Sequence, residues 1–334
     1  MKRVFTIVLI TLLLPSGLAE LSIHFLDVGQ GDATLLLCDG ESMLIDGGPP
    51  SASQFIFSYL RQHTDHLGYM IATHPHDDHV GGLAAALNAV PVDVILSPVE
   101  TYKDSAFDSV QRYADEQGAP IIVPYEGDEF DFGNAIVTIL HCWPEAWDEN
   151  DMSICLRVDY GETSFLFTGD AEAMSEYMMV DSGMPLQADV LKVGHHGSRS
   201  SSTQEFVDAV RPRYSVISCG KDNSYGHPHQ EVLDILAGST ILRTDILGTI
   251  VMHSDGETIT FDKRDGSEGE NSKEHGHDRP NSDSPVYIGN KNSMKFHYPD
   301  CSGVEKMSPK NKVPLASRED AIALGYTPCG ICQP

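Results

Sequence analysis

Basic residues are scarce in this chain. It has 22 Lys and Arg against 49 Asp and Glu, and its formal net charge at pH 7 is −27. Such a surface repels polyanions, so the composition argues against a protein that coats nucleic acid with a broad basic face. A bound divalent cation inverts the field locally, and a small metal site can therefore still act on a phosphate ester.

Long apolar runs are also scarce, and the N-terminus has the only one. Lys2 and Arg3 precede the almost wholly apolar residues 4–14, and small residues then lead to a cleavage site after Ala19. This order predicts a signal peptide over residues 1–19 and a secreted protein. An uncleaved anchor is the alternative, but the run is short for a membrane span. We therefore expect no stable membrane anchor, and no feature of the sequence points to a protein partner.

Composition divides the rest of the chain into three regions. Residues 20–261 alternate short β-rich runs with helical stretches, which predicts an α+β domain with stacked sheets and outer helices. Residues 262–285 contain no large apolar residue and are rich in Gly, Ser, Pro and charge, which predicts a flexible linker. Residues 286–334 form a small tail with its own Cys and His residues.

The seven cysteines fall into two groups. Three lie in the tail, in the company of a histidine. The other four lie on strand-like segments, and because export permits disulfides they could form two bridges or remain buried thiols. These four are Cys38, Cys142, Cys155 and Cys219.

The segment His74-Pro75-His76-Asp77-Asp78-His79 follows a short strand predicted at 69–72. In an extended chain, alternate residues point the same way, so His74 and His76 can bind one ion. The chain then turns, and Asp78 and His79 can face a second ion nearby. Imidazole and carboxylate ligands suit zinc, manganese or iron. The segment therefore predicts one or two divalent metals.

Further metal-binding residue types follow other predicted strands. Asp170 ends a strand at 164–168, where it could bridge two metals. His195 and His196 follow a strand at 189–193, and His227 follows one at 214–217. Taken alone, each of these is a weak signal. Together they place His and Asp at several strand ends, which is how a metal site is assembled on a sheet scaffold.

These residues resemble the metallo-β-lactamase superfamily, and the H-x-H-x-D-H motif of that family stands here at 74–79. The resemblance implies that Asp46 supports the motif, that Asp170 bridges metals, and that His227 is the late histidine ligand. The chain is more closely similar to the hydrolase domain of ComEC-type DNA-uptake channels, over roughly 21–262. The segments that carry this similarity are Phe25-Leu26-Asp27-Val28-Gly29-Gln30-Gly31-Asp32-Ala33, Leu191-Lys192-Val193-Gly194-His195-His196-Gly197-Ser198 and Asn223-Ser224-Tyr225-Gly226-His227-Pro228.

The family resemblance implies a four-layer αβ/βα sandwich with its site at the sandwich edge. It also implies a metal-dependent nuclease or phosphodiesterase. On this basis Asp78 would hold or deprotonate the attacking water, and His195 or His196 would bind the phosphate or protonate the leaving oxygen. Ser153 and Ser198 could orient the substrate.

The sequence departs from the family pattern at one metal ligand. Most members have a third histidine about twenty residues before the bridging aspartate, and here residues 149–153 contain none. The resemblance implies that Asn150 or Asp151 takes its place. One metal position is weakened, so single-metal occupancy is possible, and true β-lactamase activity is disfavoured.

The tail resembles an Ada-type zinc-binding module. His297 and Cys301 precede the distant pair Cys329 and Cys332, which is a pattern for one closed, structural zinc. A disulfide with one cysteine left over is the alternative. Such modules are often appended to nucleases. The tail carries six Lys and Arg against four Asp and Glu, and a mildly basic tail could touch phosphates.

These observations favour a secreted metal-dependent hydrolase that cleaves nucleic acid or another phosphodiester. Two alternatives stay open. One is hydrolysis of a small ester, lactone or thioester, which the fold also supports. The other is a zinc-dependent DNA-binding protein with a vestigial active site.

Overall fold

The computed structural model describes residues 20–261, 287–297, 301, 304, 306–315, 321 and 326–329. The predicted signal peptide, the predicted linker and Cys332 lie outside the described residues. The chain divides into two compact units, Met1–Gly266 and Ser267–Pro334, which are described separately below. Among the described residues, no helix has the length and apolarity needed to cross a membrane.

The first sheet of the larger unit has eight strands in the order β15-β14-β1-β2-β3-β4-β5-β6. Its strands β1 to β3 form an antiparallel meander, and β3 to β6 then pair in parallel. The hairpin of β14 and β15 closes the sheet beside β1. The bounds are β1 Leu21–Phe25, β2 Thr34–Cys38, β3 Glu41–Ile45, β4 Leu67–Ile71, β5 Val92–Leu96, β6 Ile121–Ile122, β14 Ile250–Ser254 and β15 Ile259–Phe261.

The second sheet has seven strands in the order β13-β12-β11-β10-β9-β8-β7. Strands β7 to β10 are antiparallel, and β10 to β13 are parallel. The bounds are β7 Glu129–Phe132, β8 Ala135–His141, β9 Cys155–Tyr160, β10 Thr163–Phe167, β11 Val190–Lys192, β12 Tyr214–Ile217 and β13 Thr240–Arg243.

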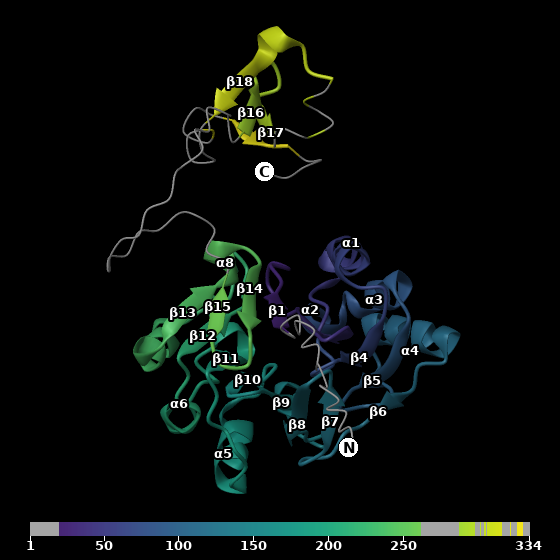
Figure 1. Cartoon of the computed structure of the whole chain (residues 1–334), viewed down its shortest axis with the longest axis vertical. Coiled ribbons are helices and arrows are strands. Elements are labelled where there is room, and N and C mark those ends of the chain that lie inside the picture. The colour runs from purple at the N-terminus through teal and green to yellow at the C-terminus, as the bar shows by residue number, and fades with distance from the viewer. Residues whose placement is uncertain are drawn as a thin grey trace, which may run out of the picture. The chain divides into compact units, whose positions relative to one another are not determined.

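Helices cover the outer face of each sheet (Figure 1). Their bounds are α1 Ser53–His63, α2 Asp77–Val80, α3 Leu83–Ala89, α4 Ser105–Gln117, α5 Ala173–Ser182, α6 Gln204–Val210, α7 Gln230–Ile235 and α8 Thr244–Leu247. Short 3₁₀ turns occur at Pro50–Ala52, Asn150–Met152, Gly194–Gly197 and Leu236–Gly238.

Three apolar cores hold these layers together. One lies between the two sheets, one lies under α1, α3 and α4, and one lies under α5, α6 and α7. Strand β9 shows how the sequence produces this order, because Leu156, Val158 and Tyr160 alternate along the strand and enter the core between the sheets. The expected four-layer αβ/βα sandwich is therefore confirmed.

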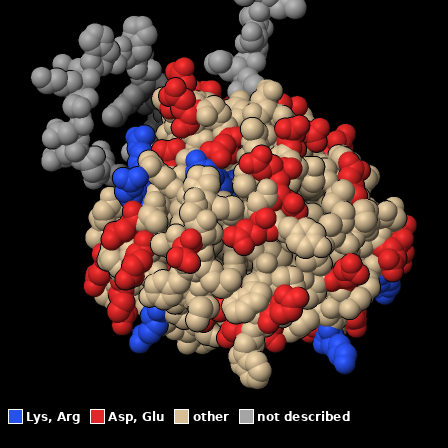
Figure 2. Space-filling model, turned by 90° about the horizontal axis from the view of Figure 1, so that it is seen from below, with Lys and Arg blue, Asp and Glu red and all other residues tan. Residues whose placement is uncertain are grey.

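The surface of this unit reflects the acidic composition. Figure 2 shows acidic side chains spread over the face seen there, with few basic ones among them. The four cysteines outside the tail form no disulfide in the structure. Burial raises the pKa of the Cys38 thiol to about 11. They are thus thiols in packed surroundings, and the two-bridge alternative is wrong for this structure.

The smaller unit is built on a four-stranded sheet in the order β18-β16-β17-β19. The bounds are β16 Tyr287–Asn290, β17 Lys295–His297, β18 Lys312–Leu315 and β19 Thr327–Pro328. Among its described residues, two apolar clusters with four buried side chains each fill the interior. The buried side chains are Phe296, Leu315, Ala321 and Tyr326 in one and Cys301, Val304, Met307 and Cys329 in the other.

Candidate metal centre and active site

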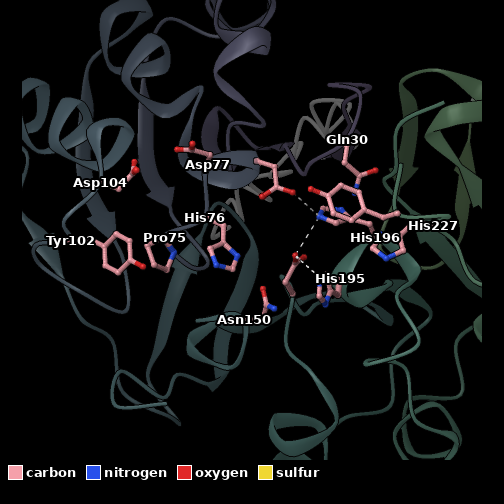
Figure 3. A pocket seen from close by; sticks show the side chains of 13 residues that line it. Gln30, Pro75, His76, Asp77, Tyr102, Asp104, Asn150, His195, His196 and His227 are labelled. Carbon is pink, nitrogen blue, oxygen red and sulfur yellow. Dashed lines mark ion pairs between the residues drawn. The ribbon is translucent and has the colours of Figure 1, made fainter. Parts of the chain in front are cut away.

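The candidate site lies where strands β4, β10 and β11 end. The H-x-H-x-D-H motif follows β4, Asp170 follows β10, and the two histidines of Gly194–Gly197 follow β11. A pocket of about 470 Å³ opens there. Figure 3 shows His76 on one side of this pocket and His196 and His227 on the other. The parts come from both sheets, so folding of the whole sandwich assembles the site.

Asp170 is the hub of the cluster. Its buried carboxylate lies within 4.0 Å of four imidazoles: 3.2 Å from Nε2 of His79, 3.3 Å from Nε2 of His196, 3.8 Å from Nε2 of His195 and 3.9 Å from Nε2 of His74. Burial by itself raises the pKa of Asp170, but His196 and His79 outweigh it and hold that pKa well below its usual range. The carboxylate is ionised and central to all four rings.

Asp46 supports the motif from the end of β3. Its Oδ1 accepts the backbone N–H of Thr73 at 2.8 Å, and its Oδ2 lies 2.8 Å from Nδ1 of His79. This contact fixes the orientation of the His79 ring, so that Nε2 points at Asp170. The structure thus places Asp46 in the supporting position that the family resemblance implies.

Asp32 gives His196 the same kind of support, and sequence reasoning missed it. Its Oδ1 lies 3.2 Å from Nδ1 of His196, which also lies 3.0 Å from the carbonyl of Ser218. Its Oδ2 accepts from Nζ of Lys192 at 2.5 Å, and both side chains are almost fully buried. The signal available was a lysine within the apolar strand β11, because a buried charge needs a partner.

The loop that carries His195 and His196 has an unusual backbone. Both residues have positive φ, 48° and 55°, in the left-handed region that non-glycine residues rarely adopt. Gly197 follows with φ 82°, and a Cβ there would lie 2.6 Å from Pro228. Such strain persists only where the surroundings determine it, and here it turns both rings toward Asp170.

His195 is held by Glu172. Its Nδ1 lies 3.1 Å from Oε1 of Glu172 and 3.1 Å from Oγ of Ser200, while its Nε2 faces Asp170. Burial opposes the protonated form, but the Glu172 hydrogen bond and Asp170 outweigh it, so the pKa of His195 is raised. Glu172 thus fixes the orientation of the His195 ring, which lines the pocket.

His76 lines the other side of the pocket and contacts His74, which is fully buried and is not part of the lining. Nε2 of His74 lies 3.0 Å from Nδ1 of His76, and Nδ1 of His74 lies 3.2 Å from Oγ1 of Thr73. Burial, followed by the neighbouring His79, lowers the pKa of His74 well below its usual value. A neutral imidazole keeps a lone pair available for a metal.

The structure separates the two candidates for the missing histidine. Asp151 turns away from the pocket: its Oδ1 accepts the N–H of Glu172 at 3.1 Å, the N–H of Ser175 at 3.4 Å and the hydroxyl of Ser175 at 2.7 Å. It serves the beginning of α5. Asn150 lines the pocket, and its buried Oδ1 has no hydrogen-bond partner among the described residues.

The two serines expected to orient substrate, Ser153 and Ser198, are both buried. Ser153 is fully buried, and its Oγ accepts the N–H of Asp170 at 3.0 Å. Ser198 is also buried, and its Oγ lies 2.9 Å from Oγ of Ser200 within the histidine loop. Their hydroxyls hold the loops that carry Asp170 and His195, and contact of either serine with substrate stays a prediction.

His227 lies outside the group of four imidazoles around Asp170, beside the rings of His195 and His196. Its ring centroid is 5.7 Å from that of His195 and 6.2 Å from that of His196, and Tyr225 stacks on it. Burial, then the charges of His196 and His195, lower its pKa to about 4. Its assignment as a metal ligand stays a prediction, while His196 lies against both Asp170 and Asp78, 3.3 Å from each.

These side chains fit a divalent cation. Donor atoms of Asp32, His79, Asp170 and His196 lie within 4.8 Å of one another, and all four residues are buried. Nε2 of His79, Nε2 of His196 and Oδ1 of Asp170 are buried, and although the rings lie 3.2 and 3.3 Å from the Asp170 carboxylate, none of these atoms has a well-directed hydrogen bond among the described residues. Carboxylates raise the pKa of His79 and of His196 against the effect of burial, so the site favours added positive charge. Because Asp32 is engaged by Lys192, the donors left for a metal are imidazoles, Asp170 and Asp78.

A second candidate metal centre lies in the smaller unit. Donor atoms of His297, Cys301 and Cys329 lie within 4.8 Å of one another, and all three are buried. Nδ1 of His297 lies 3.4 Å from Sγ of Cys301. The structure therefore brings together three of the four residues that the sequence grouped for a structural zinc.

Comparison with known proteins places this arrangement in a family. The sequence profile of the Metallo-beta-lactamase superfamily matches residues 26–221. The chain is 30% identical to ComE operon protein 3 of Bacillus subtilis over 280 residues, covering 77% of this chain and 36% of that protein. It is 33% identical to Recombination protein 2 of Haemophilus influenzae over 221 residues, covering 63% of this chain and 26% of that one.

The chain thus spans between about a quarter and about a third of the length of these two relatives. Among solved structures, the metallo-beta-lactamase fold protein YhfI from Bacillus subtilis matches with a TM-score of 0.50 at 13% identity, covering 71% of this chain and 100% of that one. This likeness concerns the fold alone. With its His/Asp cluster at the sandwich edge, the chain belongs to the metallo-β-lactamase superfamily of metal-dependent hydrolases.

Proposed function

We propose that this protein hydrolyses phosphodiester bonds of nucleic acid with the help of one or two divalent metals, zinc or manganese. The observation that carries the proposal is Asp170, whose carboxylate gathers four imidazoles at the base of an open pocket. The name of one relative, Recombination protein 2, supports nucleic acid as the substrate.

The residues divide the chemistry between them. His74, His76, Asp170 and His79 would hold the metal together with Asp78 and His196, and His227 remains a further candidate. A bound divalent ion supplies charge for the phosphoryl oxygens and a water of lowered pKa. Asp78 faces the pocket and would orient the attacking water or take its proton.

His195 would complete the reaction. The water oxygen forms a bond to phosphorus, the bond to the leaving oxygen breaks, and the leaving oxygen needs a proton. His195 lines the pocket, Glu172 fixes its ring, and against the effect of burial the Glu172 hydrogen bond and Asp170 raise its pKa, which favours the protonated form. His196 contacts Asp32 on one side and Asp170 on the other, which suits a ligand better than a proton donor.

Two further parts of the proposal concern the ends of the chain. We propose that the smaller unit holds one structural zinc and positions the nucleic acid, on the basis of its buried His297, Cys301 and Cys329 and its mildly basic tail sequence.

We also propose export, on the basis of the apolar run after Lys2 and Arg3. N-terminal sequencing of protein recovered from the medium would test cleavage after Ala19.

The activity is tested by incubating purified protein and manganese or zinc with four substrates: single-stranded DNA, plasmid, bis(p-nitrophenyl) phosphate and a lactone. We expect cleavage of DNA and of the phosphodiester, and loss of both in His76→Ala. The matched control is His66→Ala, which removes a histidine outside the pocket that pairs with Asp93 on the surface.

Other outcomes would contradict the proposal in distinct ways. Hydrolysis of the lactone alone would favour the small-ester alternative. Metal-dependent DNA binding without any hydrolysis would favour the vestigial-site alternative. Full activity in His76→Ala would show that the chemistry happens elsewhere.

A further inference from the structure

Tyr225 places an aromatic ring at the rim of the metal pocket. It lines the pocket with His227, and 65% of the residue is exposed. Its ring stacks on His227 with centroids 5.5 Å apart and an interplanar angle of 23°. One face is therefore supported from within the protein, and much of the ring remains available to a ligand.

The loop that carries Tyr225 is fixed by its own hydrogen bonds. Oδ1 of Asn223 accepts the N–H of Tyr225 at 3.2 Å and that of His227 at 3.0 Å, and its Nδ2 donates to the carbonyls of Gly220 and His227. Oε1 of Gln30 accepts the N–H of Gly220 at 3.1 Å, which ties the loop to the first sheet. The ring is thus held in place before any ligand arrives.

The charge around the pocket limits how a nucleic acid can be held. Four aspartates line it, and no Lys or Arg does among the residues that the structure describes; the aspartates are Asp77, Asp78, Asp104 and Asp170. A phosphate backbone can thus be bound at the metal and the imidazoles, but no basic groove in the lining follows it onward. Additional affinity has to come from the bases.

We propose that Tyr225 is a stacking platform for an unpaired nucleobase next to the scissile phosphate, and that the substrate is single-stranded. The inference rests on the proposed nucleic-acid hydrolysis. Aromatic side chains bind bases of any sequence by stacking, because every base has a π-face. In a duplex each base is stacked on its neighbours and paired, so it cannot lie on Tyr225 without being unstacked first.

The test compares three substrates of the same length: a single strand, the same strand with tetrahydrofuran abasic sites throughout its central part, and the duplex. For the base-containing strand we expect Tyr225→Ala to raise KM about tenfold with little change in kcat, and Tyr225→Phe to restore the wild-type KM. For the abasic strand the wild type and Tyr225→Ala should have the same KM. The duplex should be cleaved at least about tenfold less efficiently than the single strand.

Tyr125→Ala is the matched control, because it removes a 76% exposed tyrosine that does not line the pocket. Thermal unfolding of each variant checks that the fold is intact. An equal loss on base-containing and abasic strands would overturn the stacking role, since Tyr225 would then only support His227. Equal cleavage of duplex and single strand would overturn the strand preference. If the wild type cleaves no DNA at all, the proposed function itself fails.

Discussion

The two candidate metal centres of this protein are built on different plans. In the larger unit, imidazoles and carboxylates surround Asp170 at the base of an open pocket. In the smaller unit, one imidazole and two thiols meet in a buried cluster. Sites with an accessible position support chemistry, whereas closed sites with cysteine ligands stabilise folds. The comparison therefore supports the proposals of catalysis at the first centre and of a structural zinc at the second.

The apolar cores of the two units differ in the same sense. Three cores hold the larger sandwich, and they are independent of any metal. In the described part of the smaller unit, there are two clusters of four buried side chains with three partly buried ones packed against them, and two of the eight buried residues are the cysteines themselves. Removal of the metals should therefore abolish hydrolysis by the larger unit and unfold the smaller unit.

The largest expected effect is on catalysis at Asp170. Asp170→Asn removes the charge that the four imidazoles share, and we expect kcat/KM to fall about a thousandfold, which corresponds to about 4 kcal/mol. Steady-state kinetics on bis(p-nitrophenyl) phosphate and metal analysis would measure this, with Asp181→Asn on the exposed part of α5 as control. Unchanged activity would remove Asp170 from the reaction.

The next largest effect is expected in the smaller unit alone. Cys329→Ser should cost one zinc per chain and leave the smaller unit unfolded, because ligand binding there supplies folding free energy. Activity on bis(p-nitrophenyl) phosphate should stay within about twofold of wild type, since the larger unit keeps its cores. Limited proteolysis and metal analysis would report the change, with the exposed Lys306→Gln as control. A parallel loss of hydrolysis would show that the two centres depend on each other.

The sequence predicted the strands better than the helices that cover the sheets. The strands predicted at 69–72, 164–168, 189–193 and 214–217 match β4, β10, β11 and β12 within two residues, because buried β-branched and aromatic runs between glycine turns are a strong local signal. Strand β7 was not predicted, although the alternation of Glu129 and Asp131 with two phenylalanines is the pattern of a half-buried strand, because the strand is only four residues long. Helix α5 was not predicted either, because it exposes Met174, Tyr177 and Met178 and so lacks a single apolar stripe.

At the site, local motifs were predicted and long-range partners were not. The histidine motif stands in one segment, so its grouping was visible in the sequence. The contact between Asp32 and Lys192 joins residues 160 positions apart, and nothing local connects them. The roles of His195 and His196 could not be separated either, because only the left-handed backbone of both residues decides where each ring points.

A smaller effect is expected from replacing either of the two carboxylates that support histidines, Asp46 and Asp32. Asp46→Asn and Asp32→Asn each disturb the orientation of one histidine, and we expect each to lower kcat/KM by about 10- to 100-fold. Only Asp32→Asn should also destabilise the fold, by about 3 kcal/mol, because it leaves Lys192 buried without its counter-ion. Kinetics and urea unfolding measure both, with the exposed Asp93→Asn as control. Equal stability of the two variants would mean that Lys192 is paired in another way.

The smallest expected effect concerns Asn150 and Asp151, the two candidates to replace the missing third histidine. Asn150 and Asp151 are neighbours, but the first leaves a buried oxygen without a partner beside the pocket and the second is engaged at the start of α5. We therefore expect Asn150→Ala to weaken the metal affinity several-fold with almost no change in stability. Asp151→Ala should do the reverse, since losing these hydrogen bonds destabilises a helix end by about 1–2 kcal/mol. Metal titration and thermal unfolding of both variants test this pair. If Asp151→Ala alone weakened metal binding, the ligand role would pass to Asp151, and the hydrogen bonds at α5 would have to rearrange when the metal binds.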